Sequence, residues 1–292
     1  MKNTFKRIGL IAKLNNPRVA ETLTSLTTDL AQRGVSVVLD ESAASYFPTP
    51  QLTVYTRLEL SQNCDLAIAV GGDGTMLNAA RSLAEADVPM LGINLGRLGF
   101  LADVSPDEIN ERLTEIFNGQ YEEEQRSLLN AKVMRNEKLI SESDALNDVV
   151  IHKDDIARMI DLDTTINDRF IYSLRADGLI ISTPTGSTAY ALSGGGPILQ
   201  PNLPAFVLVP ICPHTLSNRP VVVDENSTID VTLKGSETDK AQITCDGQVN
   251  FSLLPGDRIQ VKRKAHQLRL IHPADHDHFN TMRKKLHWAE QP

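Results

Sequence analysis

Several features are scarce in this 292-residue chain, and each absence excludes a class of protein. No run approaches the roughly 18 consecutive apolar residues of a membrane-spanning helix, so the sequence predicts no transmembrane segment. The three cysteines form no CxxC pair, which argues against a disulfide framework or a cysteine zinc site. Basic residues number 29 against 37 acidic ones and form no basic run, which disfavours a nucleic-acid partner.

The N-terminus and the overall composition also predict a globular protein without a membrane segment. The first residues, MKNTFKRIGLIAKLNN, pass from a few charges into an apolar run without the pattern of a targeting segment. With 41% apolar and 23% charged residues and a net charge of -8, the composition is typical of a soluble globular protein. We therefore expect a cytoplasmic protein with no membrane partner, long enough for two domains.

The first 122 residues alternate short apolar runs with helical patterns. Such an alternation predicts an α/β domain with a parallel sheet and helices on its faces. One helix is expected from Pro17 to Arg33, with Gly34 as its stop, and the SPDE sequence at 105–108 is typical of a capping box. The runs expected as strands are residues 7–12, 35–40, 65–70 and 88–94.

From residue 123 to about 270 the pattern changes to strands separated by polar turns, which predicts a mainly β domain. Residues 271–292 are helix-like again, and we expect this tail to pack back on the first domain. Within the tail, HPADHDH at 272–278 fits no familiar metal-ligand spacing, so a polar loop is the preferred interpretation.

The stretch AIAVGGDGTMLNAA, residues 67–80, joins an apolar strand to a helix through a glycine-rich turn. At the carboxyl end of such a strand, backbone N–H groups of the following helix face anions. We expect the glycines to allow positive φ and close approach of phosphates. The predicted phosphate loop comprises Gly71, Gly72, Gly74 and Thr75.

Asp73 is the unusual member of this turn, because a P-loop has a lysine in this neighbourhood. A phosphate oxygen about 4 Å away would repel the carboxylate by roughly 4 kcal/mol at an effective dielectric of 20. Either a bridging divalent cation or a substrate hydroxyl explains it, and both indicate phosphoryl transfer. The plainer alternative is a helix cap. Arg97 and Arg175 are the candidate counter-charges.

A second polar cluster lies in RADGLIISTPTGSTAYALSGGGPI, residues 175–198. Thr185, Ser187 and Thr188 offer hydroxyls that suit sugar and phosphate contacts. Asn147 and Asp148 precede another strand; an amide pairs with a base edge and a carboxylate accepts ribose hydroxyls, although a plain Asx turn is the alternative. The first strand lacks the GxGxxG of a dinucleotide-binding dehydrogenase, so hydride transfer is disfavoured.

Taken together, GGDGT, LGINLGRLGFLAD, LNDVVIHK, DGLIISTPTGSTAYALSGGGP and PICPHTLSNRPVV closely resemble the NAD kinase family, in the same order along the chain. GGDGT is shared with diacylglycerol and sphingosine kinases, whereas the STPTGSTAYALSGGGP block is selective. The resemblance implies transfer of the terminal phosphate of ATP to the 2′-hydroxyl of the adenosine ribose of NAD. It also implies a divalent metal, Mg or Mn, and a homodimer or homotetramer.

The resemblance also assigns roles to residues of this chain. Asp73 corresponds to the family's proton acceptor. The positions that correspond to dinucleotide contacts are Asp73, Gly74, Asn147, Asp148, Arg158, Arg175, Asp177, Thr188, Ala189, Tyr190, Ala191, Leu192, Ser193 and Gln248. A lipid kinase of the diacylglycerol type and a dinucleotide sensor without turnover stay open as alternatives. The groups that hold the metal, and the use of polyphosphate or NADH, also stay open.

Overall fold

The computed structural model describes residues 5–13, 16–47, 52–96, 99–155, 158–236 and 240–288. The chain forms two compact units, defined by their internal contacts. Unit 1 comprises residues 1–125 and 268–292, and unit 2 comprises residues 126–267. The domain limits that the sequence predicts, after residues 122 and 270, lie close to these limits and stay a prediction.

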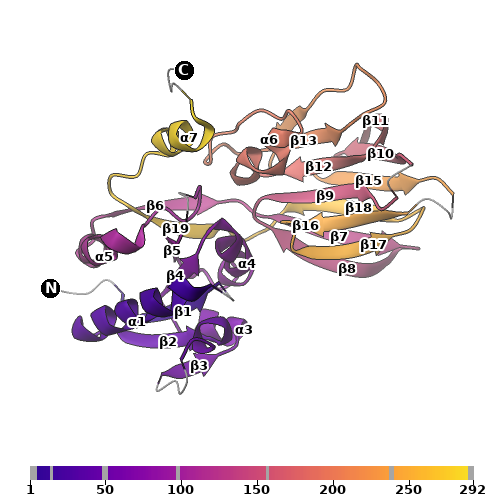
Figure 1. The fold of residues 1–292 in the computed structure, drawn as a ribbon. Coiled ribbons are helices and arrows are strands. Elements are labelled where there is room, and N and C mark those ends of the chain that lie inside the picture. The colour runs from indigo at the N-terminus through magenta and orange to yellow at the C-terminus, as the bar shows by residue number, and fades with distance from the viewer. Residues whose placement is uncertain are drawn as a thin grey trace. The chain divides into compact units, whose positions relative to one another are not determined.

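Unit 1 contains one seven-stranded sheet in the order β3-β2-β1-β4-β5-β19-β6 (Figure 1). Its strands are β1 (Arg7–Ala12), β2 (Ser36–Asp40), β3 (Thr53–Tyr55), β4 (Leu66–Gly71), β5 (Met90–Asn94), β6 (Tyr121–Arg126) and β19 (Leu268–Pro273). Neighbours from β3 through β19 pair in parallel, which confirms the predicted parallel sheet. β19 joins this sheet beside β5, whereas the sequence pattern predicts most of this strand to be part of the β domain. Strand propensity does not identify the partner strand.

The helices of unit 1 follow its strands, as the alternation predicts. They are α1 (Pro17–Gln32), α2 (Glu41–Ala44), α3 (Arg57–Gln62), α4 (Asp73–Leu83), η1 (Pro106–Glu108), α5 (Ile109–Phe117) and α7 (His278–Leu286). The predicted capping box is wrong: Ser105 caps no backbone N–H, and its hydroxyl donates to Glu108 instead, since the first turn is a 3-10 helix. No described helix has the length and apolar character to cross a membrane.

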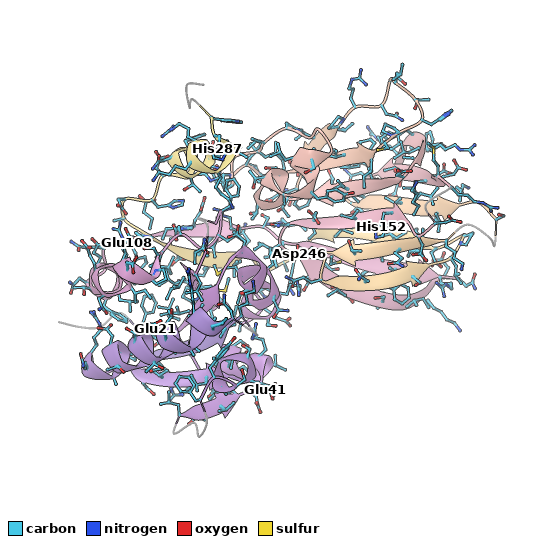
Figure 2. The ribbon with its side chains drawn as sticks, viewed as in Figure 1. Glu21, Glu41, Glu108, His152, Asp246 and His287 are labelled. Carbon is cyan, nitrogen blue, oxygen red and sulfur yellow. The ribbon has the colours of Figure 1, made fainter. Side chains whose placement is uncertain are left out.

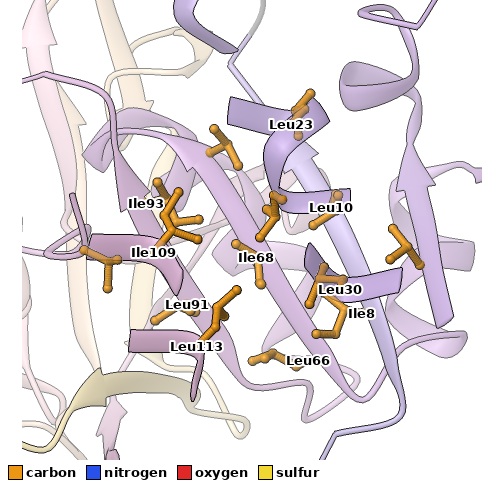
Figure 3. Packing of buried hydrophobic residues seen from close by; sticks show 14 of the residues in the cluster. Ile8, Leu10, Leu23, Leu30, Leu66, Ile68, Leu91, Ile93, Ile109 and Leu113 are labelled. Carbon is orange, nitrogen blue, oxygen red and sulfur yellow. The ribbon is translucent and has the colours of Figure 1, made fainter. Parts of the chain in front are cut away.

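The core of unit 1 lies between the sheet and the helices on its faces. Figure 3 shows Ile8 and Ile68 of the sheet packed with Leu23 and Leu30 of α1. All residues of β4 are buried, because a central parallel strand is covered on both faces. This burial explains the unbroken apolar run before the glycine-rich turn and fixes the place where that turn begins.

Unit 2 contains two antiparallel sheets of six strands each. The first, in the order β11-β10-β15-β18-β7-β8, comprises β7 (Leu129–Arg135), β8 (Lys138–Ala145), β10 (Ile160–Ile166), β11 (Arg169–Ala176), β15 (Ile229–Lys234) and β18 (Arg258–Arg263). The second, in the order β14-β13-β12-β9-β16-β17, comprises β9 (Asp148–Lys153), β12 (Gly178–Ser182), β13 (Ala205–Ile211), β14 (Val221–Asp224), β16 (Ala241–Cys245) and β17 (Val249–Leu253). The prediction of a mainly β second part is confirmed.

Apolar side chains from both sheets form one shared core in unit 2, as in a β-sandwich. The second sheet has a further apolar layer on its outer face, where Val150, Ile180 and Val209 pack with Ala191. Ala191 belongs to α6 (Tyr190–Ser193), which follows the 3-10 helix η2 (Thr185–Thr188). The segment rich in Thr, Ser and Gly is thereby anchored on the outer face of β9 and β12.

Removing buried volume at the centre of unit 1 should destabilise it. We expect Ile68→Ala, at a fully buried position of β4, to lower the free energy of unfolding by about 2–5 kcal/mol. Leu58→Ala, on the exposed side of α3, should change that free energy by less than about 0.5 kcal/mol. Denaturant titration followed by the helical circular-dichroism signal measures both. Equal losses would show that β4 is not central to the core.

Candidate functional site

The turn between β4 and α4 is shaped by close packing rather than by left-handed backbone. Gly71 ends β4, and a Cβ there would collide with the hydroxyl of Thr75 and approach Cβ of Lys13 to 2.9 Å. Gly72 is extended, with φ 176°, and Gly74 lies in α4. The expected positive φ values are therefore wrong; the turn needs glycine at Gly71 for space, and Gly74 leaves the helix N-terminus exposed.

The Asp73 carboxylate is held by three consecutive backbone N–H groups. Phe100 donates to Oδ2 at 3.0 Å, and Leu101 and Ala102 donate to Oδ1 at 3.0 and 3.3 Å. The helix-cap alternative is wrong, because Gly72 occupies the N-cap of α4 and no side chain caps it. The carboxylate is fixed at the turn by a loop that follows the neighbouring strand β5.

Two glycines that sequence reasoning left without a role allow this loop to approach. A Cβ at Gly99 would collide with Asp73 Oδ1, and a Cβ at Gly92 would lie 2.7 Å from Cα of Ala102. Both positions belong to LGINLGRLGFLAD, one of the stretches that carry the family resemblance, although no role is predicted for its glycines. The signal was present in the sequence, but its purpose depends on a contact between two separate turns.

The counter-charge of Asp73 comes from the far end of the chain. Lys285 Nζ, in the last turn of α7, lies 3.5 Å from Asp73 Oδ2 and 4.5 Å from the centre of the Phe100 ring. The sequence had suggested Arg97 or Arg175 for this part. Arg97 lies outside the described residues, and Arg175 is an exposed residue of unit 2 that lies 4.0 Å from Asp161.

The second predicted pair, Asn147 and Asp148, lies in unit 2 where β9 begins beside the ends of β12 and β16. Asp148, the first residue of β9, is paired with Ser182 at the end of β12, and Val149 is paired with Cys245 at the end of β16. Directly after Cys245, the Asp246 carboxylate accepts hydrogen bonds from the N–H groups of 146–148, at 3.0, 2.7 and 3.3 Å. Asp246 thus fixes the backbone that presents Asn147 and Asp148.

The environment of Asp148 favours its protonated form. Its side chain is buried, with 5% of the residue exposed, and no described residue donates a hydrogen bond to its carboxylate. Burial, reinforced by the charge of Asp246, raises the pKa of Asp148 to about 7. A buried carboxylate without donors is an acceptor that a ligand hydroxyl can satisfy.

A cavity of about 570 Å³ opens over the outer face of β9. Alternate residues of that strand, Asp148, Val150 and His152, line it, as the two-residue period of a strand requires. Two of the lining residues, His152 and Asp246, are labelled in Figure 2. The complete lining consists of Asn147, Asp148, Val150, His152, Lys153, Asp177, Ala189, Tyr190, Ile211, Thr244, Asp246 and Gly247. The volume suits a nucleoside-sized group.

The structure gathers some of the predicted contacts around this cavity and leaves others outside its lining. Those that line it are Asn147, Asp148, Asp177, Ala189 and Tyr190. Those that do not are Arg158, Arg175, Thr188, Ala191, Leu192, Ser193 and Gln248. Ala191 is fully buried in the apolar layer, whereas Arg175 is two-thirds exposed. Their predicted contacts stay predictions.

Hydroxyls of the 183–188 segment bind mainly to their own chain. Ser187 is fully buried; its hydroxyl donates to the Pro184 carbonyl at 2.6 Å and accepts from the Leu199 N–H at 2.9 Å. Thr185 accepts from the buried Arg126 at 3.2 Å. The expectation that Ser187 offers its hydroxyl to a ligand is therefore wrong. These hydroxyls fix the segment to Leu199 and to Arg126.

Sequence reasoning missed the lining residues Asp246, His152 and Lys153. Asp246 and Gly247 both have positive φ, 53° and 63°, in the tight turn between β16 and β17, and the DG pair was the available signal. Lys153 pairs with Asp177 at 2.7 Å across the cavity wall. The Lys153–Asp177 pair and the hydrogen bonds to Asp246 do not follow from local sequence, because the partners meet only once the sheet has formed.

Two family models match the chain. The first, described as the ATP-NAD kinase N-terminal domain, covers residues 8–121. The second, described as the ATP-NAD kinase C-terminal domain, covers residues 146–273. The two matches together include the β4–α4 turn and the strand ends around Asp148, so both polar sites fall within recognised parts of one family.

Full-length relatives agree with these matches. An NAD kinase of Nitrosococcus oceani is 47% identical over 291 residues, spanning 100% of this chain and 99% of the relative. An NAD kinase of Shewanella piezotolerans is 50% identical, spanning 100% of this chain and 94% of the relative. Each of these two relatives aligns with the chain over its whole length.

Solved structures show the same fold. A yeast NADH kinase complexed with NADH superposes with a TM-score of 0.90 at 24% identity, covering 100% of this chain and 90% of the other. An NAD kinase from Archaeoglobus fulgidus in complex with ATP gives a TM-score of 0.74 at 26% identity, covering 97% and 99%. Sequence, family models and fold agree, and this chain belongs to the NAD kinase family.

Proposed function

We propose that this protein is an ATP-dependent NAD kinase, which transfers the terminal phosphoryl group of ATP to the 2′-hydroxyl of the adenosine ribose of NAD and yields NADP and ADP. The observation that carries the proposal is the Asp73 carboxylate, which three N–H groups fix at a glycine-rich helix N-terminus. Phosphoryl transfer depends mainly on positioning and charge stabilisation, and both are built into this turn.

Asp73 orients the acceptor hydroxyl and takes its proton. The backbone donors occupy both lone pairs of Oδ1 and one of Oδ2, so the second lone pair of Oδ2 is the one that accepts the ribose hydroxyl. A carboxylate is a weak base toward a sugar hydroxyl, so the proton moves late, after the bond to phosphorus has begun to form. Lys285 offsets the negative charge that Asp73 adds beside the phosphates.

The glycine-rich turn receives the phosphates. Gly74 is exposed and Gly72 half-exposed at the N-terminus of the eleven-residue helix α4, where the helix dipole favours anions. Gly71 and Thr75 pack against each other beneath them and keep the turn narrow. We assign these four residues to the phosphate loop.

The adenosine part of NAD binds in the cavity over β9. Asn147 offers an amide for the base edge, and Asp148 offers the buried carboxylate that lacks donors. The pair Lys153–Asp177 and the ring of Tyr190 bound the remaining wall. The other dinucleotide contacts that the family resemblance assigns, such as Arg158 and Gln248, lie outside the lining of this cavity and belong to the same proposal.

A divalent cation, Mg or Mn, fits this chemistry as a companion of ATP. Asp73 already accepts three hydrogen bonds and lies near Lys285, so it suits one contact to a metal and not a protein-built cage. When bound with ATP, the cation would neutralise the charge of the phosphates.

We also propose cytoplasmic localisation. We propose a homodimer or homotetramer as the assembly, and light scattering of the purified protein tests the number of chains in it.

An NADP-forming assay tests the proposed function. The full chain is incubated with Mg²⁺, NAD and ATP, and NADP is measured by a coupled dehydrogenase; parallel reactions replace ATP by polyphosphate or NAD by NADH. Sustained formation of NADP from ATP and NAD is the expected result. Tight NAD binding without product would favour the dinucleotide sensor, and phosphorylation of diacylglycerol in vesicles would favour the lipid kinase.

Removing the charge of Asp73 should abolish most turnover and spare NAD binding. We expect Asp73→Asn to lower kcat by about 10²–10⁴-fold, the usual contribution of a positioned base, while Kd for NAD changes by less than about threefold. Steady-state rates and calorimetry measure the two quantities.

Removing the charge of Lys285, the ion-pair partner of Asp73, should lower kcat less than Asp73→Asn does. Lys285→Met removes a partly exposed ion pair and should lower kcat by about fivefold, whereas Lys284→Met, at the exposed neighbouring position, should leave the rate unchanged. Near-normal turnover in Asp73→Asn would contradict the assignment of the base, whatever the result at Lys285.

Binding of NAD should strengthen as Asp148 ionises. Its pKa of about 7 means that the carboxyl is mostly protonated at pH 6 and mostly ionised at pH 8. The ionised form accepts a ribose hydroxyl much more strongly than the protonated form, so Kd for NAD should fall about tenfold between these pH values. Calorimetry at constant ionic strength measures this dependence.

The matched variants are Asp148→Asn and Asp168→Asn. The first removes the titrating group and should give weak binding that is almost independent of pH. The second lies at an exposed turn of unit 2 and should keep the wild-type profile. A pH profile that survives in Asp148→Asn would assign the titration to another group.

A further inference from the structure

A second cluster of polar side chains lies in unit 1, next to the loop that holds the Asp73 carboxylate. It consists of Asp103, His272 and His276, whose carboxylate oxygen and ring nitrogens all lie within 4.8 Å of one another. Asp103 follows β5, His272 lies near the end of β19, and His276 lies in the turn that leads to α7. None of the three has a part in the proposed phosphoryl transfer.

We propose that Asp103, His272 and His276 bind one transition-metal ion of the zinc class, separate from the cation that accompanies ATP. Nδ1 of His272 lies 2.9 Å and Nδ1 of His276 lies 2.8 Å from the same oxygen, Asp103 Oδ2. Zinc binds imidazole nitrogen and carboxylate oxygen at about 2.0–2.2 Å, so ligand atoms must first converge on one point. These three atoms converge without a change of fold.

The two histidine rings lie side by side on the same carboxylate oxygen. Each ring can donate a proton from Nδ1 to Oδ2, and the rings stack with centroids 4.0 Å apart and planes at 20°. In the neutral tautomer that donates from Nδ1, Nε2 carries no proton. A cation that binds all three atoms would displace both Nδ1 protons and leave the rings neutral.

The surroundings have the second layer that metal-binding histidines use. His272 Nε2 lies 3.3 Å from Glu124 Oε2, so a metal on Nδ1 leaves the other ring nitrogen to donate toward a carboxylate. The side chain of His272 is 1% exposed, Asp103 is 9% and His276 10%. Such a site is nearly closed, and its donor set of two nitrogens and one oxygen favours zinc or cobalt over magnesium.

The position of the site gives the metal a structural effect. Asp103 directly follows Phe100, Leu101 and Ala102, whose N–H groups hold the Asp73 carboxylate. A bound ion would tie this loop to β19 and to the turn before α7, the helix that presents Lys285. The metal would brace the loop behind the catalytic aspartate without touching substrate.

The preferred sequence interpretation of HPADHDH as a polar loop considered only local spacing. Two histidines four residues apart matched no metal motif by themselves, and Asp103 is 169 residues from His272 in the sequence. The third ligand becomes visible only when β19 is placed beside β5.

Metal titration of the full chain tests the proposal. After treatment with a chelator, a Cys212→Ser form, which removes the exposed thiol, is titrated with Zn²⁺ and separately with Co²⁺ in the absence of ATP. We expect about one tightly bound equivalent per chain, a rise in Tm, and the visible absorption bands of Co²⁺ in a low-symmetry nitrogen and oxygen site.

Variants locate the bound ion. His276→Gln and Asp103→Asn should each lose the tight equivalent and the Co²⁺ bands, whereas His266→Gln, at an exposed site of unit 2, should keep both. If the unsubstituted cluster binds no ion and gives no Co²⁺ bands, the proposal is overturned and the cluster is an ion-paired aspartate. Binding that persists in both variants at the cluster overturns it too. The NADP-forming assay is independent of either outcome.

Discussion

The organisation of unit 1 depends on one interaction, the capture of the Asp73 carboxylate by the N–H groups of Phe100, Leu101 and Ala102. It joins the turn after β4 to the loop after β5 and requires glycine at two places where the backbones meet. Because the donors belong to the main chain, the carboxylate is oriented before any substrate arrives. An aspartate beside phosphates is tolerable only when its position and its charge are both controlled.

Unit 2 uses the same device for a different purpose. Asp246 accepts hydrogen bonds from three consecutive N–H groups, as Asp73 does. Unlike Asp73, it lines the cavity over β9 and lies near a second carboxyl, that of Asp148. Its negative charge, together with burial, makes ionisation of Asp148 unfavourable. One aspartate is thereby stabilised by backbone donors while the adjacent one lacks them. Asp246 is therefore held by backbone donors, whereas Asp148 is buried without them.

The features that could be predicted from the sequence are those that local patterns determine. The apolar run before Gly71, the turn with Asp73 and the pair Asn147–Asp148 were recognised because strand burial and turn chemistry leave clear signals. The partners of these residues were not recognised. Lys285 is 212 residues from Asp73, and Asp246 is 98 from Asp148. Such contacts arise from the pairing of distant strands, which composition and spacing do not specify.

The return of β19 to the first sheet has a consequence for synthesis of the chain. The strands from β1 to β5 emerge from the ribosome early, yet their sheet lacks a neighbour for β5 until all of unit 2 has followed. Lys285 emerges later still. Unit 2 therefore has time to fold as an insertion while the first sheet waits with an open edge. A nascent chain that stopped before β19 would hold the aspartate of the turn without the cation that balances it.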